Sequence, residues 1–119
     1  MGYTFVRMII KKSYESEKFV EERLLVDSGA IYTVVPAEDL EELGIAAHSE
    51  EEFELADGEV IKRKVGDAYF EYKGRKGSAP VVFGEKGDSK LLGVLTLEAL
   101  GFVLDPLKRQ IKPFRKRLA

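Results

Sequence analysis

The sequence predicts an all-β fold, either a small closed barrel or a sandwich, and two observations support this prediction. Short runs rich in β-branched and aromatic residues recur along the chain, which is the pattern of strands. Glycine-containing turns separate these runs at short intervals, as in small closed β-folds. Because the chain has 119 residues, we expect one domain over residues 1–119.

Each expected strand is an apolar, β-branched or aromatic run that stops at glycine, proline or charged residues. In chain order the runs are Thr4–Ile10, Phe19–Val26, Tyr32–Val35, Phe53–Leu55, Val60–Val65, Ala68–Tyr72, Ser78–Phe83, Phe102–Asp105 and Gln110–Phe114. Asp57-Gly58 supplies the positive φ angles of a tight hairpin turn. Lys73-Gly74 predicts the next turn, and Gly84–Lys90 a polar loop. The aromatic residues expected in the core are Phe5, Phe19, Phe70, Phe83 and Phe102.

Two short stretches predict helices. Ala37–Leu43 has acidic residues in its first turn, and Gly44 is placed to end it. Thr96–Leu100 has Thr96 as its expected N-cap and Gly101 just past its end. The apolar run that precedes the second helix is expected to be buried.

The most informative segment is an apolar run that leads directly into Asp27, Ser28 and Gly29. A carboxylate at the end of a buried strand is expected to be half-buried, where desolvation raises its pKa. Gly29 has no Cβ, so a second backbone or a ligand can come close, and Ser28 can hydrogen-bond across a tight turn. This chemistry suits a catalytic aspartate, although Asp-Ser-Gly is also an ordinary turn sequence.

Composition excludes several kinds of protein. There is no cysteine and a single histidine, so the sequence predicts neither a disulfide nor a metal site, and no cofactor. No signal peptide or membrane-length apolar run is visible, which predicts a cytoplasmic protein without a membrane partner. The chain has no Asn, one Gln and 34% charged residues, which is typical of thermophile proteins.

The charge is unevenly distributed, although the net charge is only −2 and gives no global field for nucleic acid. Ten acids and no Lys or Arg lie between Glu38 and Glu59, and six bases and no acids lie between Lys108 and Arg117. These segments are either a solvated face and tail, or surfaces that attract another subunit or a charged partner.

Taken in order, these pieces resemble the retropepsin-like aspartic proteases, the small dimeric enzymes related to the retroviral proteases. Asp27-Ser28-Gly29-Ala30 is similar to the family's Asp-Thr/Ser-Gly-Ala motif, and Thr33–Val35 continues it. Leu91-Leu92-Gly93 and the following helix are similar to its second signature. The resemblance covers residues 4 to 114, and the run Leu100–Pro106 looks more like prokaryotic and cellular members than viral ones.

The resemblance implies a single-lobe, closed acid-protease barrel with one or two short helices. It implies an endopeptidase that acts on a peptide or protein substrate. Only one Asp-Ser-Gly is present in the chain, whereas the family's reaction needs two aspartates. Asp27 and its twofold mate in a homodimer would therefore share a proton and activate a water molecule.

The resemblance also assigns roles to other residues. Ser28 would hydrogen-bond across the dimer, and Gly29 and Ala30 would complete the catalytic loop. The remaining assignments are a flap at Ala56, Asp57 and Gly58, a pocket lining at Val35 and Leu91, packing behind the loop at Leu92 and Gly93, and terminal pairing between subunits at Ile111–Phe114.

The chain departs from the viral pattern at a few positions. Viral members often carry acids where this chain has Ile31 and Tyr32, and a base where it has Val94. These departures leave a second hypothesis open, that of a protease-like dimerisation or peptide-binding module without activity. The basic C-terminal segment leaves a third, a nucleic-acid binder, although the aromatic residues that would alternate with the bases are missing beyond Phe114.

Overall fold

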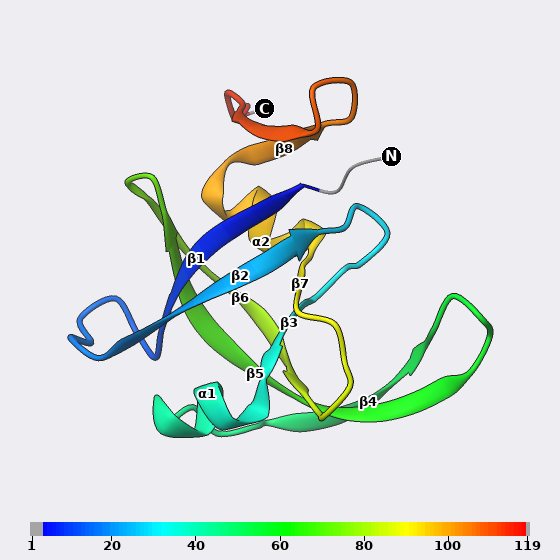
Figure 1. The fold of residues 1–119 in the computed structure, drawn as a ribbon. Helices are drawn as coiled ribbons and strands as arrows, with labels where there is room; N and C mark the ends of the chain where they lie inside the picture. Colours follow the sequence, from blue (N-terminus) through cyan, green and yellow to red (C-terminus); the bar gives the residue numbers. More distant parts are fainter. Residues whose placement is uncertain (1–3, 119) are drawn as a thin grey trace.

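The computed structural model describes residues 4–118, which form mostly strands with two short helices (Figure 1). The all-β fold class is therefore confirmed. The strands are β1 (Phe5–Lys11), β2 (Phe19–Val26), β3 (Thr33–Pro36), β4 (Ser49–Glu54), β5 (Val60–Tyr72), β6 (Arg75–Gly84), β7 (Leu91–Leu92), β8 (Phe102–Asp105) and β9 (Gln110–Pro113). The helices are α1 (Ala37–Glu42) and α2 (Val94–Leu100).

The main sheet closes on itself as an irregular barrel. Its strand order is β1-β2-β7-β3-β6-β5-β4, and β1 also pairs with β5, which closes the ring of pairings. The closure is loose at β7, which is two residues long and meets β3 only at the pair Val34 and Leu91. β4 lies outside the ring, and the β4–β5 hairpin extends away from the barrel in Figure 1.

The interior follows the two-residue period of the strands. On β1 the even-numbered side chains Val6, Met8 and Ile10 are buried, and the odd-numbered ones point outward or are half-buried. Phe70 of β5 is fully buried among them, and Leu40 of α1 is fully buried in the same core. Burial of each such side chain stabilises the fold by about 1.5–3 kcal/mol.

Two of the five phenylalanines expected in the core are not there. Phe5 is 41% exposed and Phe19 is 56% exposed, whereas Phe70, Phe83 and Phe102 are buried as predicted. Phe5 occupies an odd-numbered position of β1, on the outer face, where the Arg23 guanidinium lies 3.7 Å from the centre of its ring. A cation–π contact of this kind covers an aromatic ring that stays near solvent.

The second helix begins earlier than the sequence predicts. α2 starts at Val94 with Gly93 as its N-cap residue, so the prediction of Thr96 as the N-cap is wrong. Thr96 lies inside the helix and is fully buried. The predicted end is confirmed, because Gly101 has φ 78° in the left-handed region.

The runs Val60–Val65 and Ala68–Tyr72, predicted as separate strands, form the single strand β5. Gly66 is buried within it, where a Cβ would lie 2.9 Å from the Ala46 carbonyl oxygen. The glycine therefore serves a close approach of backbone rather than a break in the strand. The predicted turn after β5 is confirmed, with φ 49° at Lys73 and 80° at Gly74.

The C-terminal segment forms its own small sheet. β8 and β9 pair with each other, Phe102 opposite Pro113 and Asp105 opposite Gln110. The Phe114 N–H donates to the Gly101 carbonyl oxygen at 2.9 Å, which joins this sheet to the end of α2.

Candidate active site

Asp27 is the first residue after β2 and is half-buried, as its place after an apolar strand predicts. Its Oδ1 accepts a hydrogen bond from the Gly29 N–H at 2.8 Å, and its carbonyl oxygen accepts one from the Ala30 N–H at 3.1 Å. Its own N–H donates to the Leu92 carbonyl oxygen at 3.2 Å. Hydrogen bonds thus fix the backbone of Asp27 and one of its carboxylate oxygens.

Ser28 and Gly29 are exposed beside this carboxylate. A Cβ at Gly29 would lie 3.2 Å from Asp27 Oδ1, closer than most Cβ contacts. Glycine therefore lets the carboxylate occupy its position against the backbone of the turn. The outer surface of the loop stays open to a partner or a ligand.

The second motif lies directly beside the first. β7 runs parallel to β2, with Leu25 opposite Leu91 and Val26 opposite Leu92. Leu92 is fully buried and Leu91 is half-buried. The structure thus brings Asp27 and Leu91–Gly93 together at one end of the barrel.

Gly93 packs against the backbone of the loop between β2 and β3. A Cβ at Gly93 would lie 2.5 Å from the Tyr32 carbonyl carbon and 2.6 Å from the Ile31 carbonyl oxygen, so only glycine fits. The following N–H groups, of Val94 and Leu95, donate to the carbonyl oxygens of Ala30 and Ile31 at 2.9 and 3.1 Å. The start of α2 therefore holds the whole loop that begins at Asp27.

A buried pair of threonines, missed by the sequence analysis, completes this support. The Gly93 N–H donates to Thr33 Oγ1 at 3.0 Å, and Thr33 Oγ1 lies 2.6 Å from Thr96 Oγ1. Both threonines are fully buried, so their hydroxyl groups need each other as partners. A threonine within each apolar run was the only sequence signal for this pair.

The residues expected to form a flap lie at the tip of the β4–β5 hairpin. Ala56, Asp57 and Gly58 are all exposed. The prediction is confirmed at Gly58, which has φ 88°, and is wrong at Asp57, which does not have a positive φ; instead Asp57 Oδ1 accepts a hydrogen bond from the Glu59 N–H at 2.9 Å. Across the turn, the Leu55 N–H donates to the Glu59 carbonyl oxygen at 2.8 Å.

Tyr32 connects the loop after Asp27 to this hairpin. Its hydroxyl donates to Glu51 Oε1 at 3.4 Å, and its ring meets the Phe53 ring edge-on at 5.7 Å between centres. Burial of the phenol and the nearby Glu51 carboxylate raise the pKa of Tyr32. The Tyr32 side chain is half-buried against β4.

Val35 does not fit the pocket role that the resemblance implied, because its side chain is fully buried in the core. Its neighbour Val34 instead lines a cavity of about 730 Å³ on another part of the surface. The walls of this cavity come from the β3–α1 junction and the loop after β6, and Asp27 is not among them. Acidic and basic side chains of both segments surround it: Glu38, Glu41, Glu85, Lys86, Asp88 and Lys90.

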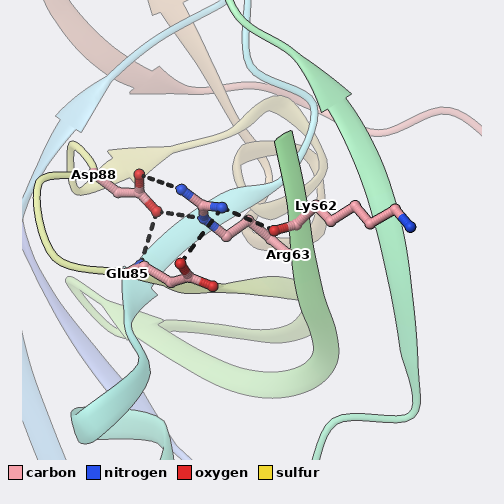
Figure 2. A network of polar contacts seen from close by, with 4 residues as sticks. All are labelled: Lys62, Arg63, Glu85 and Asp88. Atoms are coloured by element: carbon pink, nitrogen blue, oxygen red, sulfur yellow. Dashed lines mark hydrogen bonds and ion pairs between the residues drawn. The ribbon is translucent and has the colours of Figure 1, made fainter. Parts of the chain in front are cut away.

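The loop after β6 is pinned to β5 by the network in Figure 2. The Arg63 guanidinium donates to both carboxylate oxygens of Asp88, at 2.7 and 2.9 Å, and to the Lys62 carbonyl oxygen at 2.8 Å. Asp88 also accepts a bond from the Glu85 N–H at 2.7 Å. The hydrogen bonds from Arg63 hold the pKa of Asp88 below its usual value, so this pair stays charged in mild acid.

A second carboxyl group with a shifted pKa lies on α1. Burial, followed by the hydrogen bond and charge of Glu22, raises the pKa of Asp39 to about 7. Asp39 Oδ2 is buried and has no hydrogen-bond donor from the protein. A protonated Asp39 donates to Glu22, which lowers the pKa of Glu22, and Lys90 adds an ion pair to Glu22 at 2.9 Å.

Within residues 4–118, no group of three or more His, Cys, Asp or Glu side chains is arranged to hold a metal ion. The same part of the chain has no helix long and apolar enough to cross a membrane.

No protein-family model matches this sequence, and no curated protein matches it. Among solved structures, the chain is similar to the crystal structure of a retropepsin-like aspartic protease from Rickettsia conorii. The two sequences are 24% identical, and the match covers 87% of this chain and 85% of that chain with a TM-score of 0.47.

Proposed function

We propose that this protein is an aspartic endopeptidase that acts as a homodimer, with one Asp27 from each subunit at the site. The observation that supports this most directly is the setting of Asp27. Its carboxylate is half-buried, its Oδ1 is held by the Gly29 N–H, and the loop around it is bound to the start of α2. A reacting group has to be held this firmly for efficient catalysis.

In the proposed reaction the two carboxyl groups share one proton, because two neighbouring carboxylates do not both ionise easily. The ionised Asp27 removes a proton from a water molecule, whose oxygen attacks the peptide carbonyl carbon. The protonated Asp27 of the other subunit gives its proton to the carbonyl oxygen. The C–N bond of the tetrahedral intermediate then breaks: the leaving amine takes up a proton from the first carboxyl group, and one hydroxyl of the intermediate returns its proton to the Asp27 carboxylate of the other subunit as the carbonyl re-forms.

The single Asp-Ser-Gly makes a second copy necessary for this chemistry. Ser28 and Gly29 are exposed, so they are free to meet their symmetry mates in an isologous contact. The exposed hairpin tip at Ala56, Asp57 and Gly58 would close over a bound peptide from each subunit and exclude water. Leu91, which is half-buried, would contribute apolar surface to the pocket.

The test is the substitution Asp27→Asn, assayed with fluorogenic peptide libraries between about pH 3 and 7. We expect cleavage to fall at least about a thousandfold while sedimentation shows the same dimer. Asp67→Asn is the matched control, because Asp67 is an exposed acid on β5 and is not assigned to the site. Cleavage by Asp27→Asn at the wild-type rate, or activity from a strict monomer, would contradict the proposal.

A second candidate function is peptide binding without cleavage. Ile31 and Tyr32 stand where viral members often carry acids, and Tyr32 is already engaged by Glu51 and Phe53. Peptide capture by a well-folded wild-type dimer, with no cleavage across the same pH range, would favour this function over the first.

A further inference from the structure

The β4–β5 hairpin has a distinct inner face. Residues directly opposite in an antiparallel pair project to the same side, and here Glu51 is opposite Arg63 and Phe53 is opposite Ile61. These four side chains are half-buried, whereas the neighbouring residues that point the other way are exposed. The exposed residues are Glu50, Glu52, Lys62 and Lys64.

The inner face meets the body of the protein at two loops. Glu51 and Phe53 of β4 contact Tyr32, which lies in the loop that starts at Asp27. Arg63 of β5 binds Asp88, which lies in the loop that leads into β7 (Figure 2). The first of these loops starts at Asp27, and the second leads into Leu91 and Leu92, which pair with β2.

The two contacts differ in strength. The Arg63–Asp88 pair has two charge-assisted bonds, and its side chains are only 15% and 22% exposed. Partly buried bidentate pairs of this kind are among the stronger hydrogen bonds. Tyr32 offers a single bond of 3.4 Å and one edge-on ring contact. Arg63 therefore provides the firm contact and Tyr32 the weaker one.

Beyond these contacts the hairpin is open. Every residue from Leu55 to Val60 is exposed, and a Cβ at Gly58 would meet no described atom within 4 Å. The hairpin thus consists of a base, residues 49–54 and 60–65, and a tip, residues 55–59, in which every residue is exposed. Val60 is at the border of the two.

We propose that Arg63 and Tyr32 are positioning residues: they hold the base of the hairpin against the loop that starts at Asp27 and the loop that leads into β7, so that only the tip moves over a bound peptide. The effect on substrate rests on the proposed peptidase function. The difference in mobility between base and tip is a property of the free protein, so it can be tested whether or not the protein cleaves peptides.

The experiment is backbone amide hydrogen exchange of the free wild-type protein and three variants. Arg63→Met removes the guanidinium and keeps the stem, and Tyr32→Phe removes one hydroxyl. Lys62→Met is the matched control, because Lys62 directly precedes Arg63 in β5 and points to the exposed face. We expect Arg63→Met to speed exchange in residues 49–54 and 61–65 about tenfold or more, while β1 keeps its rate.

We expect a smaller increase, of about two- to fivefold, for Tyr32→Phe, and no change for Lys62→Met. Equal exchange of the base in Arg63→Met and Lys62→Met would overturn the proposal, as would equally fast exchange of base and tip in the wild type. If Arg63→Met does not fold, Arg63→Lys decides in the same way. It keeps the charge and loses the bidentate geometry, so the base should again exchange faster.

Enzyme kinetics separate this proposal from the function on which it rests. If the protein cleaves peptides, Arg63→Met should raise KM more than it lowers kcat, since it disturbs the cover and leaves Asp27 in place. If Asp27→Asn proves as active as the wild type but the exchange pattern holds, the peptidase mechanism fails and the positioning role stands. If Asp27→Asn is inactive but the exchange pattern is absent, the positioning role of Arg63 and Tyr32 fails and the peptidase mechanism stands.

Discussion

The hydroxyl oxygens of Thr33 and Thr96 lie 2.6 Å apart in the interior and join the start of β3 to α2. Thr33 also accepts the Gly93 N–H, so a short chain of bonds runs from the loop around Asp27 to the second motif. Since both threonines are fully buried, neither hydroxyl can exchange its partner for water.

Removal of one hydroxyl should therefore be costly. Thr96→Val keeps the shape of the side chain and leaves Thr33 with an unsatisfied buried group, so we expect a loss of about 1–3 kcal/mol in the free energy of unfolding. Urea denaturation measures this loss. Thr96→Ser keeps the hydroxyl and is the control, with a smaller loss that reflects only the missing methyl group.

Gly93→Ala should destabilise the protein by several times as much as an ordinary surface change, about 3 kcal/mol or more. The new Cβ would lie 2.5 Å from the Tyr32 carbonyl carbon, and this neighbour is backbone that cannot rotate away. Thermal unfolding followed by circular dichroism checks the effect. A variant as stable as the wild type would show that the start of α2 does not press on this loop.

Gly29→Ala, in contrast, should reduce peptide cleavage strongly and change stability little. Its Cβ would lie 3.2 Å from Asp27 Oδ1, a side-chain atom that can shift, so we expect a change of about 1 kcal/mol or less in stability. The shift would misplace the proposed catalytic carboxylate, and cleavage should fall about a hundredfold. Peptide assays and unfolding curves of the same sample separate the two effects.

Asp39 should make stability fall as the pH rises from about 4 to 7. Its pKa is raised from the ordinary 3.8 to about 7 in the folded state, so in this window the folded protein binds more protons than the unfolded chain. The contribution of Glu22 has the opposite sign, but its pKa is lowered from 4.5, so its window lies below that pH. Between pH 5 and 7 the Asp39 effect should dominate.

Asp39→Asn should flatten this pH dependence. The amide keeps the shape and supplies a permanent donor to Glu22, so at pH 8 we expect the variant to be more stable than the wild type by on the order of 1 kcal/mol. Solvent reaches the pair and screens it, which keeps the difference modest. Glu41→Gln, an exposed acid on α1 that is not among the groups that raise the pKa of Asp39, is the control. Parallel stability curves for wild type and Asp39→Asn would contradict the assignment.

Phenylalanine truncations should separate core from surface. Phe70 is fully buried, so Phe70→Ala should lower the free energy of unfolding by about 3–5 kcal/mol. Phe19 is 56% exposed, so Phe19→Ala should cost about 1 kcal/mol or less. Denaturant midpoints at constant slope measure both values, and similar losses for the two variants would contradict the placement of Phe19.

Features that depend on local backbone chemistry were predictable from the sequence. Gly58, Gly74 and Gly101, in two turns and at a helix end, have the positive φ angles that glycine adopts readily. The strand that leads to Asp27 was equally visible, because an apolar run and a following turn are both local signals.

Features that depend on partners distant in the chain were not predictable. The two faces of a strand differ in burial only once the register is set, so the sequence alone does not show that Phe5 and Phe19 lie on the exposed face. Gly66 predicts the end of a strand in the sequence, because the backbone that approaches it, at Ala46, lies 20 residues earlier and is not visible from the local pattern. The Arg63–Asp88 pair likewise joins residues far apart in the sequence.

β5 runs without interruption from Val60 to Tyr72, so one strand supplies both a wall of the barrel and an arm of the hairpin. Side chains alternate in direction at every residue, and nothing between the two parts resets that alternation. A single inserted residue near Lys64 would turn Arg63 and Ile61 outward relative to the wall, whereas two inserted residues would restore the original sides. Natural or engineered insertions in this arm should therefore preserve the fold when they add an even number of residues and disrupt it when they add an odd number.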